Sequence, residues 1–213
     1  MPLPDIHEAL DALTQVDRLR EVVADRERFH GYSGGARLAG GLAALAAGGL
    51  LAAPFYPRTP TAQLAGWAAV LAVGLAANYA ALLRWFLCQP DARRELFRLR
   101  PAWDAVPPLA AAGILSLAAV QHGNYDLLFG IWMCGFALVH AAYRRNLPAA
   151  NYLLGAGYMV AGAACLLLPV PFTNPWPMAL TFFVGETIGG AIFIRDARPR
   201  RATPTDPLPE EPA

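Results

Sequence analysis

The sequence carries little charge, and none of it comes from lysine. Only 15% of the 213 residues are charged, and all 17 basic residues are arginine. The formal net charge of +1 provides no strongly basic surface, so we expect no nucleic-acid partner. At the same time 56% of the residues are hydrophobic, which lies outside the usual composition of a soluble domain. The composition therefore predicts a membrane protein.

Metal-binding and catalytic motifs are also lacking. The three cysteines, Cys88, Cys134 and Cys165, show neither CxxC nor Cys/His spacing, so we interpret them as packing residues and predict no metal site and no cofactor. No loop contains HExxH, GxSxG, a P-loop or paired carboxylates, which argues against an enzyme. The charged first thirty residues are unlike a cleavable signal peptide.

Long apolar runs dominate the rest of the chain. Each is close to the roughly 17 to 25 residues of a spanning helix, although the first and third are short. Proline and asparagine in the intervening breaks favour helix ends there. The six runs lie at about 37–53, 64–86, 105–121, 125–143, 149–169 and 176–194.

The arginines are distributed unevenly between alternate breaks. Cytoplasmic loops retain positive charge, whereas translocated short loops do not. Sixteen of the 17 arginines fall in the N-terminal segment, the second and fourth breaks and the tail, and the other three breaks contain only Arg58. This pattern predicts six spans with both termini in the cytoplasm. The sixteen are Arg18, Arg20, Arg26, Arg28, Arg37, Arg84, Arg93, Arg94, Arg98, Arg100, Arg144, Arg145, Arg195, Arg198, Arg200 and Arg201.

The predicted fold is all-α, a polytopic bundle of six transmembrane helices with an amphipathic cytoplasmic helix before it. Leucine and valine recur at three- and four-residue steps within residues 4–30, between alternating acidic residues and arginines. We predict a cytoplasmic N-terminal helix and glycine-rich joint over 1–35 and a transmembrane domain over 36–196. The proline-rich residues 197–213 are predicted to form a disordered cytoplasmic tail.

Small residues are predicted to let the helices approach closely. Gly185 and Gly189 form a GxxxG pair on one face of the last run. We interpret this pair as a contact within the bundle, with a homodimer interface as the alternative.

Polar residues within the apolar runs mark the candidate ligand or proton site. Glu186 is central, because a charge at mid-bilayer costs at least about 2.5 to 3.5 kcal/mol. Depth in the membrane can be counted inward from the cytoplasmic ends of the runs at about 1.5 Å per residue. On this count Tyr158, His140 and Asn78 lie in the cytoplasmic half of the membrane, as Glu186 does. If the four converge, they could share a proton or bind a small polar ligand. The alternative is a protonated Glu186 satisfied by Tyr158 or a backbone carbonyl.

The loop QHGNYD, residues 121–126, provides an outer candidate. His122 and Asp126 are four residues apart and could face each other on one helical turn. The alternative is a polar turn in which Asn124 or Asp126 caps the next helix.

The charged N-terminal helix, the GYSG joint and the closing GGAIFIR resemble small bacterial six-helix membrane proteins that have no assigned activity. The resemblance implies the bacterial inner membrane. We hypothesise a small transporter or ligand-binding membrane subunit built around Glu186. The alternative is a structural or regulatory component that binds a protein partner through its N-terminal helix or bundle surface; a membrane enzyme is a third reading.

Overall fold

The computed structural model describes residues 14–16, 33–88, 103–144 and 147–196. Every described element is helical, so the all-α prediction is confirmed for these residues. The predicted N-terminal helix lies outside the described residues except for the helical residues 14–16, and the tail lies wholly outside them. The elements are α2 (Gly34–Ala52), α3 (Pro60–Cys88), α6 (Val106–Gln121), η2 (Tyr125–Leu127), α7 (Leu128–Ala142), α8 (Ala149–Leu167) and α9 (Trp176–Asp196).

Five of the described helical segments are long and apolar enough to cross a membrane. The chain is therefore a multi-pass membrane protein. All six predicted runs are helical, but α6 has only 16 residues. Its length of about 24 Å falls short of the roughly 30 Å hydrocarbon core. By length and hydropathy, five candidate spans lie in the described part of the chain, and the sixth predicted span is not confirmed.

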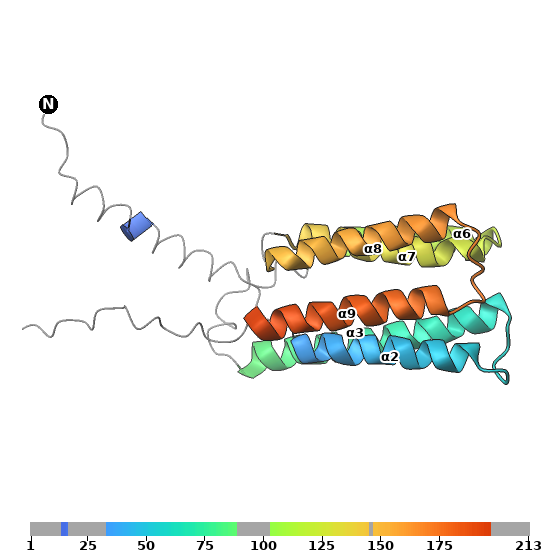
Figure 1. Ribbon diagram of the computed structural model, residues 1–213, viewed down its shortest axis with the longest axis horizontal. Coiled ribbons are helices and arrows are strands. Elements are labelled where there is room, and N and C mark those ends of the chain that lie inside the picture. Colours follow the sequence, from blue (N-terminus) through green and yellow to red (C-terminus); the bar gives the residue numbers. More distant parts are fainter. Residues whose placement is uncertain (1–13, 17–32, 89–102, 145–146, 197–213) are drawn as a thin grey trace, which may run out of the picture.

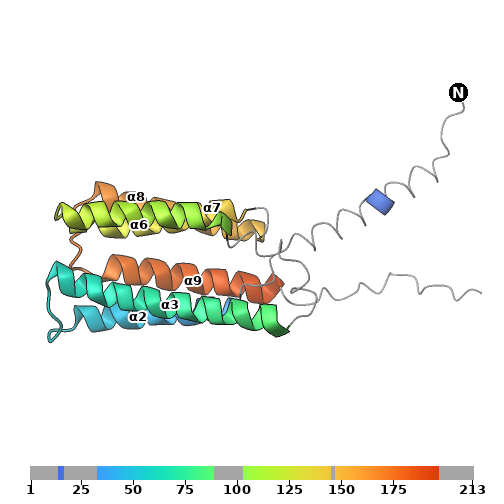
Figure 2. The same ribbon diagram turned by 180° about the vertical axis from the view of Figure 1, so that it is seen from behind.

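The helices form two groups of three that run nearly parallel to one another (Figures 1 and 2). The first and last helices, α2 and α9, pack along each other, and α3 packs on α2; we call these three the α2 group. In the second group α7 contacts both α6 and α8, and we call it the α7 group. Contact between α8 and α9 joins the two groups. Segments far apart in the sequence therefore meet at the interface between groups.

Glycines on α2 allow the close approach to α9. A Cβ atom at Gly34 would lie 2.7 Å from the carbonyl oxygen of Gly190, and one at Gly48 would overlap the Cβ of Ala179. Small residues at these positions let the two backbones come close and make extensive van der Waals contacts. These contacts drive helix association in lipid, where the hydrophobic effect does not.

Aromatic residues join the two groups at the end of the bundle where α2 finishes. The rings of Phe129 in α7 and Phe172 in the loop before α9 are 4.8 Å apart, and Trp67 of α3 meets Phe129 edge-on at 5.9 Å. Phe129 and Phe172 are fully buried. Such offset and edge-to-face pairs stabilise a core beyond the area they bury.

The turn between α6 and α7 depends on a glycine. Gly123 has φ of 72°, a left-handed conformation that a residue with a side chain rarely adopts. The turn lets α7 fold back along α6 after its short entry helix η2.

Candidate functional site

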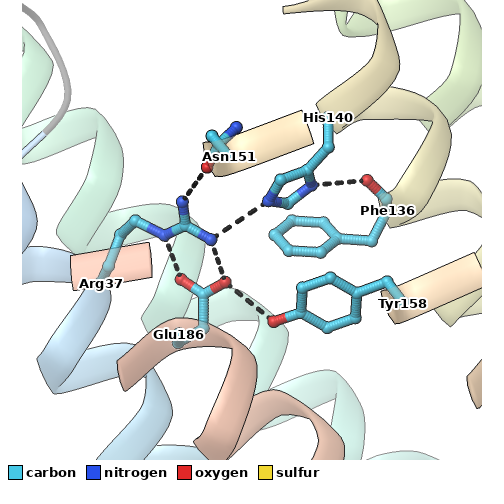
Figure 3. Close-up of polar contacts among 6 residues, drawn as sticks. All are labelled: Arg37, Phe136, His140, Asn151, Tyr158 and Glu186. Carbon is cyan, nitrogen blue, oxygen red and sulfur yellow. Dashed lines mark hydrogen bonds and ion pairs between the residues drawn. The ribbon is translucent and has the colours of Figure 1, made fainter. Parts of the chain in front are cut away.

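A buried ion pair between Arg37 and Glu186 forms the centre of the candidate site (Figure 3). Arg37 lies in the first turn of α2, which Ser33 caps by accepting a hydrogen bond from the amide of Ala36. The Nε of Arg37 donates to Oε2 of Glu186 at 2.9 Å, and its Nη2 donates to Oε1 at 2.8 Å. This bidentate geometry is the strongest that the two groups can form. Their exposed fractions are only 5% and 9%, so the pair is held away from water.

Two residues of the α7 group extend the network. Nη1 of Arg37 donates to Oδ1 of Asn151 in α8 at 2.8 Å, and Nη2 lies 3.2 Å from Nε2 of His140 in α7. Both partners are buried, with 1% of Asn151 and 4% of His140 exposed. The guanidinium group therefore bridges the two helix groups, since it binds α9 on one side and α7 and α8 on the other.

The contacts of His140 determine its charge state. Its Nδ1 is 2.9 Å from the carbonyl oxygen of Phe136, which can only accept a hydrogen bond. Its Nε2 faces the guanidinium of Arg37, which can only donate. Nδ1 therefore carries the proton, Nε2 accepts, and the imidazole is neutral. Glu186 alone then balances the charge of Arg37 within this network.

Tyr158 completes the network from α8. Its hydroxyl donates to Oε1 of Glu186 at 3.1 Å, while its ring packs 5.2 Å from the ring of Phe182 in α9. A Cβ atom at Gly185 would overlap this phenol, and one at Gly189 would overlap the guanidinium of Arg37. The GxxxG pair is therefore used within the chain, where it makes room for two side chains of the site.

The structure brings together three of the four predicted inner residues. Glu186, Tyr158 and His140 meet around Arg37 (Figure 3). The backbone of Asn78 lies in α3, but its side chain is outside the described part of the chain. Whether the cluster holds a ligand or exchanges protons stays a prediction. Glu186 is hydrogen-bonded to Tyr158, as the alternative interpretation expected, and it also pairs with Arg37, which the sequence interpretation did not include.

Sequence reasoning missed Arg37 and Asn151. Arg37 was grouped with the arginines that flank the membrane, although the structure buries it. Asn151 follows the break RRNLP and looks like part of a turn. Two features of the sequence indicate that Arg37 could be buried. It is surrounded by small and apolar residues in ARLAGG, and Glu186 needs a counter-charge.

The outer loop makes neither of the contacts that the sequence suggested, which were a His122–Asp126 pair and a helix cap by Asn124 or Asp126. Oδ1 of Asp126 accepts a hydrogen bond of 2.7 Å from the amide of Phe172, and so ties this loop to the one before α9. Asn124 precedes η2 without a side-chain capping bond. His122 is exposed at the end of α6, and within the described loop no hydrogen bond joins it to Asp126.

A pocket of about 310 Å³ lies near this end of the bundle, between the end of α2 and the start of α9. Arg58, Thr173, Asn174 and Trp176 are among its lining residues. It is separate from the Arg37 network, whose residues do not line it. For the described residues, no group of three or more histidine, cysteine or acidic side chains is arranged to hold a metal ion.

Comparison of the chain with protein-family models, with curated proteins and with solved structures finds no match. The resemblance to small bacterial six-helix proteins therefore supports only the coarser statement that the chain is a multi-pass membrane protein. Any statement of function has to rest on the geometry of the site.

Proposed function

We propose that the protein is a small membrane transporter for a polar solute, in which Glu186 exchanges a proton and the network around Arg37 holds the two helix groups together at one end of the bundle. The observation that carries the proposal is the ion pair at the interface between the two helix groups. Ionisable residues inside a membrane bundle mark solute or proton pathways more often than they serve packing.

Movement of one helix group against the other would open this end. Arg37 and Glu186 belong to the α2 group, whereas their partners Asn151, His140 and Tyr158 belong to the α7 group. Rigid-body movement between two packed halves breaks such contacts together, because packed interfaces switch between discrete arrangements. A proton on Glu186 would weaken the hydrogen bond that its carboxylate accepts from Tyr158 across this interface, and so favour the open arrangement.

The resemblance to small bacterial six-helix proteins implies the bacterial inner membrane, and the arginine distribution supports a cytoplasmic location for both termini. Removal of buried Arg37 from the flanking arginines leaves the asymmetry intact, since Arg58 is still the single arginine in the three alternate breaks. In this orientation the Arg37 network lies toward the cytoplasm and the pocket beside Arg58 faces the other side.

Infrared titration of the full chain in nanodiscs tests the proposal. If Glu186 exchanges a proton, acidification should produce a carboxylic-acid band. Glu186→Gln should abolish this band, whereas Asp126→Asn should leave it in place, because Asp126 lies in a loop away from the network. Liposomes containing the wild type should take up protons after an acid pulse faster than liposomes containing Glu186→Gln.

The proposal fails if Glu186 contributes no titrating band and the two liposome preparations behave alike. That result would favour the second candidate, a structural or regulatory membrane component. Its specific support is the saturation of the site, since all three guanidinium nitrogens and both carboxylate oxygens are already paired. The apolar face of α3 supplies a surface for lipid or a partner, with Leu71, Leu75 and Leu83 all exposed.

A further inference from the structure

Two buried polar atoms lie at the opposite end of the bundle from the Arg37 network. Among the described residues, Oε1 of Gln63 and Nε1 of Trp67 are the buried side-chain atoms without a hydrogen-bond partner. Gln63 is completely buried and Trp67 is 3% exposed. One atom is an acceptor and the other a donor, so together they have complementary unmet needs.

The two residues are neighbours on one helix. They are four positions apart in α3, a spacing that places side chains next to each other on the same face. Their hydrogen-bonding atoms are nevertheless not paired directly. A bridging atom that donates to Gln63 and accepts from Trp67 would satisfy both.

The other half of the Gln63 amide fixes its orientation. Its Nε2 donates to the carbonyl oxygen of Leu51 at 3.0 Å, which satisfies one of the last carbonyls of α2. A flipped amide would place Oε1 against that carbonyl, where two acceptors would repel each other. Oε1 is therefore the atom that faces away from α2 and needs a donor.

We propose that a single buried water molecule binds here, donating a hydrogen bond to Oε1 of Gln63 and accepting one from Nε1 of Trp67. A water molecule has both functions on one small atom, and buried waters characteristically join polar groups that the protein leaves unpaired. The Phe129 ring lies 5.9 Å from that of Trp67. The bound water would link α2 and α3 to the aromatic contact with α7.

The test uses indole spectra of the full chain, labelled with ¹⁵N-tryptophan in nanodiscs. Trp67→Phe assigns the Trp67 signal. We expect a nuclear Overhauser cross-peak between the Trp67 indole proton and long-lived water. We also expect Gln63→Met to move the Trp67 indole signal upfield, because the water loses one of its two anchors.

A matched substitution calibrates the shift. Nε1 of Trp132 donates directly to Oγ of Ser116 at 2.8 Å, so Ser116→Ala shows how far an indole signal moves when its acceptor is lost. We expect a shift of comparable size at Trp67 in Gln63→Met. Ser116→Ala should leave the Trp67 signal in place.

Two results would overturn the proposal: the absence of a water cross-peak at Trp67, and a Trp67 signal that does not move in Gln63→Met. If the cross-peak is absent but Gln63→Met still moves the signal, the two side chains bond directly. If Gln63→Met does not fold, the cross-peak in the unsubstituted chain decides the matter alone.

Discussion

Substitution of the buried ion pair should show strong coupling between Arg37 and Glu186. Glu186→Met leaves the guanidinium buried without a counter-charge, and a guanidinium cannot escape by losing its proton. Arg37→Met likewise leaves the carboxylate of Glu186 buried without a counter-charge. Breaking a buried pair in this way costs about 3 to 5 kcal/mol of unfolding free energy, so the two single losses should sum to about 6 to 10 kcal/mol.

The double variant Arg37→Met/Glu186→Met should lose far less than this sum. It buries no unpaired charge, but it leaves Asn151, His140 and Tyr158 without their hydrogen bonds. At about 1 kcal/mol for each neutral bond, the expected loss is about 3 kcal/mol. The coupling energy of the double-mutant cycle is therefore about 3 to 7 kcal/mol.

Reversible unfolding in mixed lipid–detergent micelles, followed by tryptophan fluorescence, measures all four states of the cycle. Arg58→Met is the matched control, because it removes an exposed arginine. It should change stability by no more than about 0.5 kcal/mol. Additive losses in the cycle would refute the pairing, since independent residues show no coupling.

Two further substitutions test the packing and the edge of the site. Gly48→Ala should lower the free energy of unfolding by about 1 to 3 kcal/mol, because the new Cβ would overlap that of Ala179. Gly49→Ala is the control, since its Cβ meets nothing within 4 Å and should leave stability unchanged or raise it. Thermal unfolding measures both variants, and equal stabilities would contradict the prediction. Tyr158→Phe removes only the hydroxyl that bonds Glu186, so unfolding should show a loss of about 1.5 to 3 kcal/mol with no change in helix content by circular dichroism. A stability equal to that of the wild type would show that this hydrogen bond contributes nothing.

Helix positions were predictable because their signals are local. Apolar runs and intervening proline and asparagine placed each described helix within a few residues of its observed bounds; the run at 176–194, for example, is α9 at Trp176–Asp196. The count of spans was less secure. A run of intermediate length such as α6 does not state by itself whether it crosses the bilayer.

Part of the candidate site could also be predicted. Glu186 stands out because a carboxylate within an apolar run is costly, and the inward count brought Tyr158 and His140 to the same part of the membrane. Depth along a helix follows from residue number. Direction around the helix axis and the choice of neighbours depend on packing between helices, so convergence was left open.

Hydropathy and the cost of buried charge act on each residue separately, so the sequence alone indicates a helical membrane protein with an acidic group inside it. The group that neutralises this charge depends on how the helices pack. Arg37 has the sequence context of a membrane-flanking residue. It becomes the partner of Glu186, which lies 149 residues further along the chain, because α2 packs against α9. Such long-range pairing depends on how small and large side chains fit together between helices. This fit cannot be deduced from any single segment of the sequence.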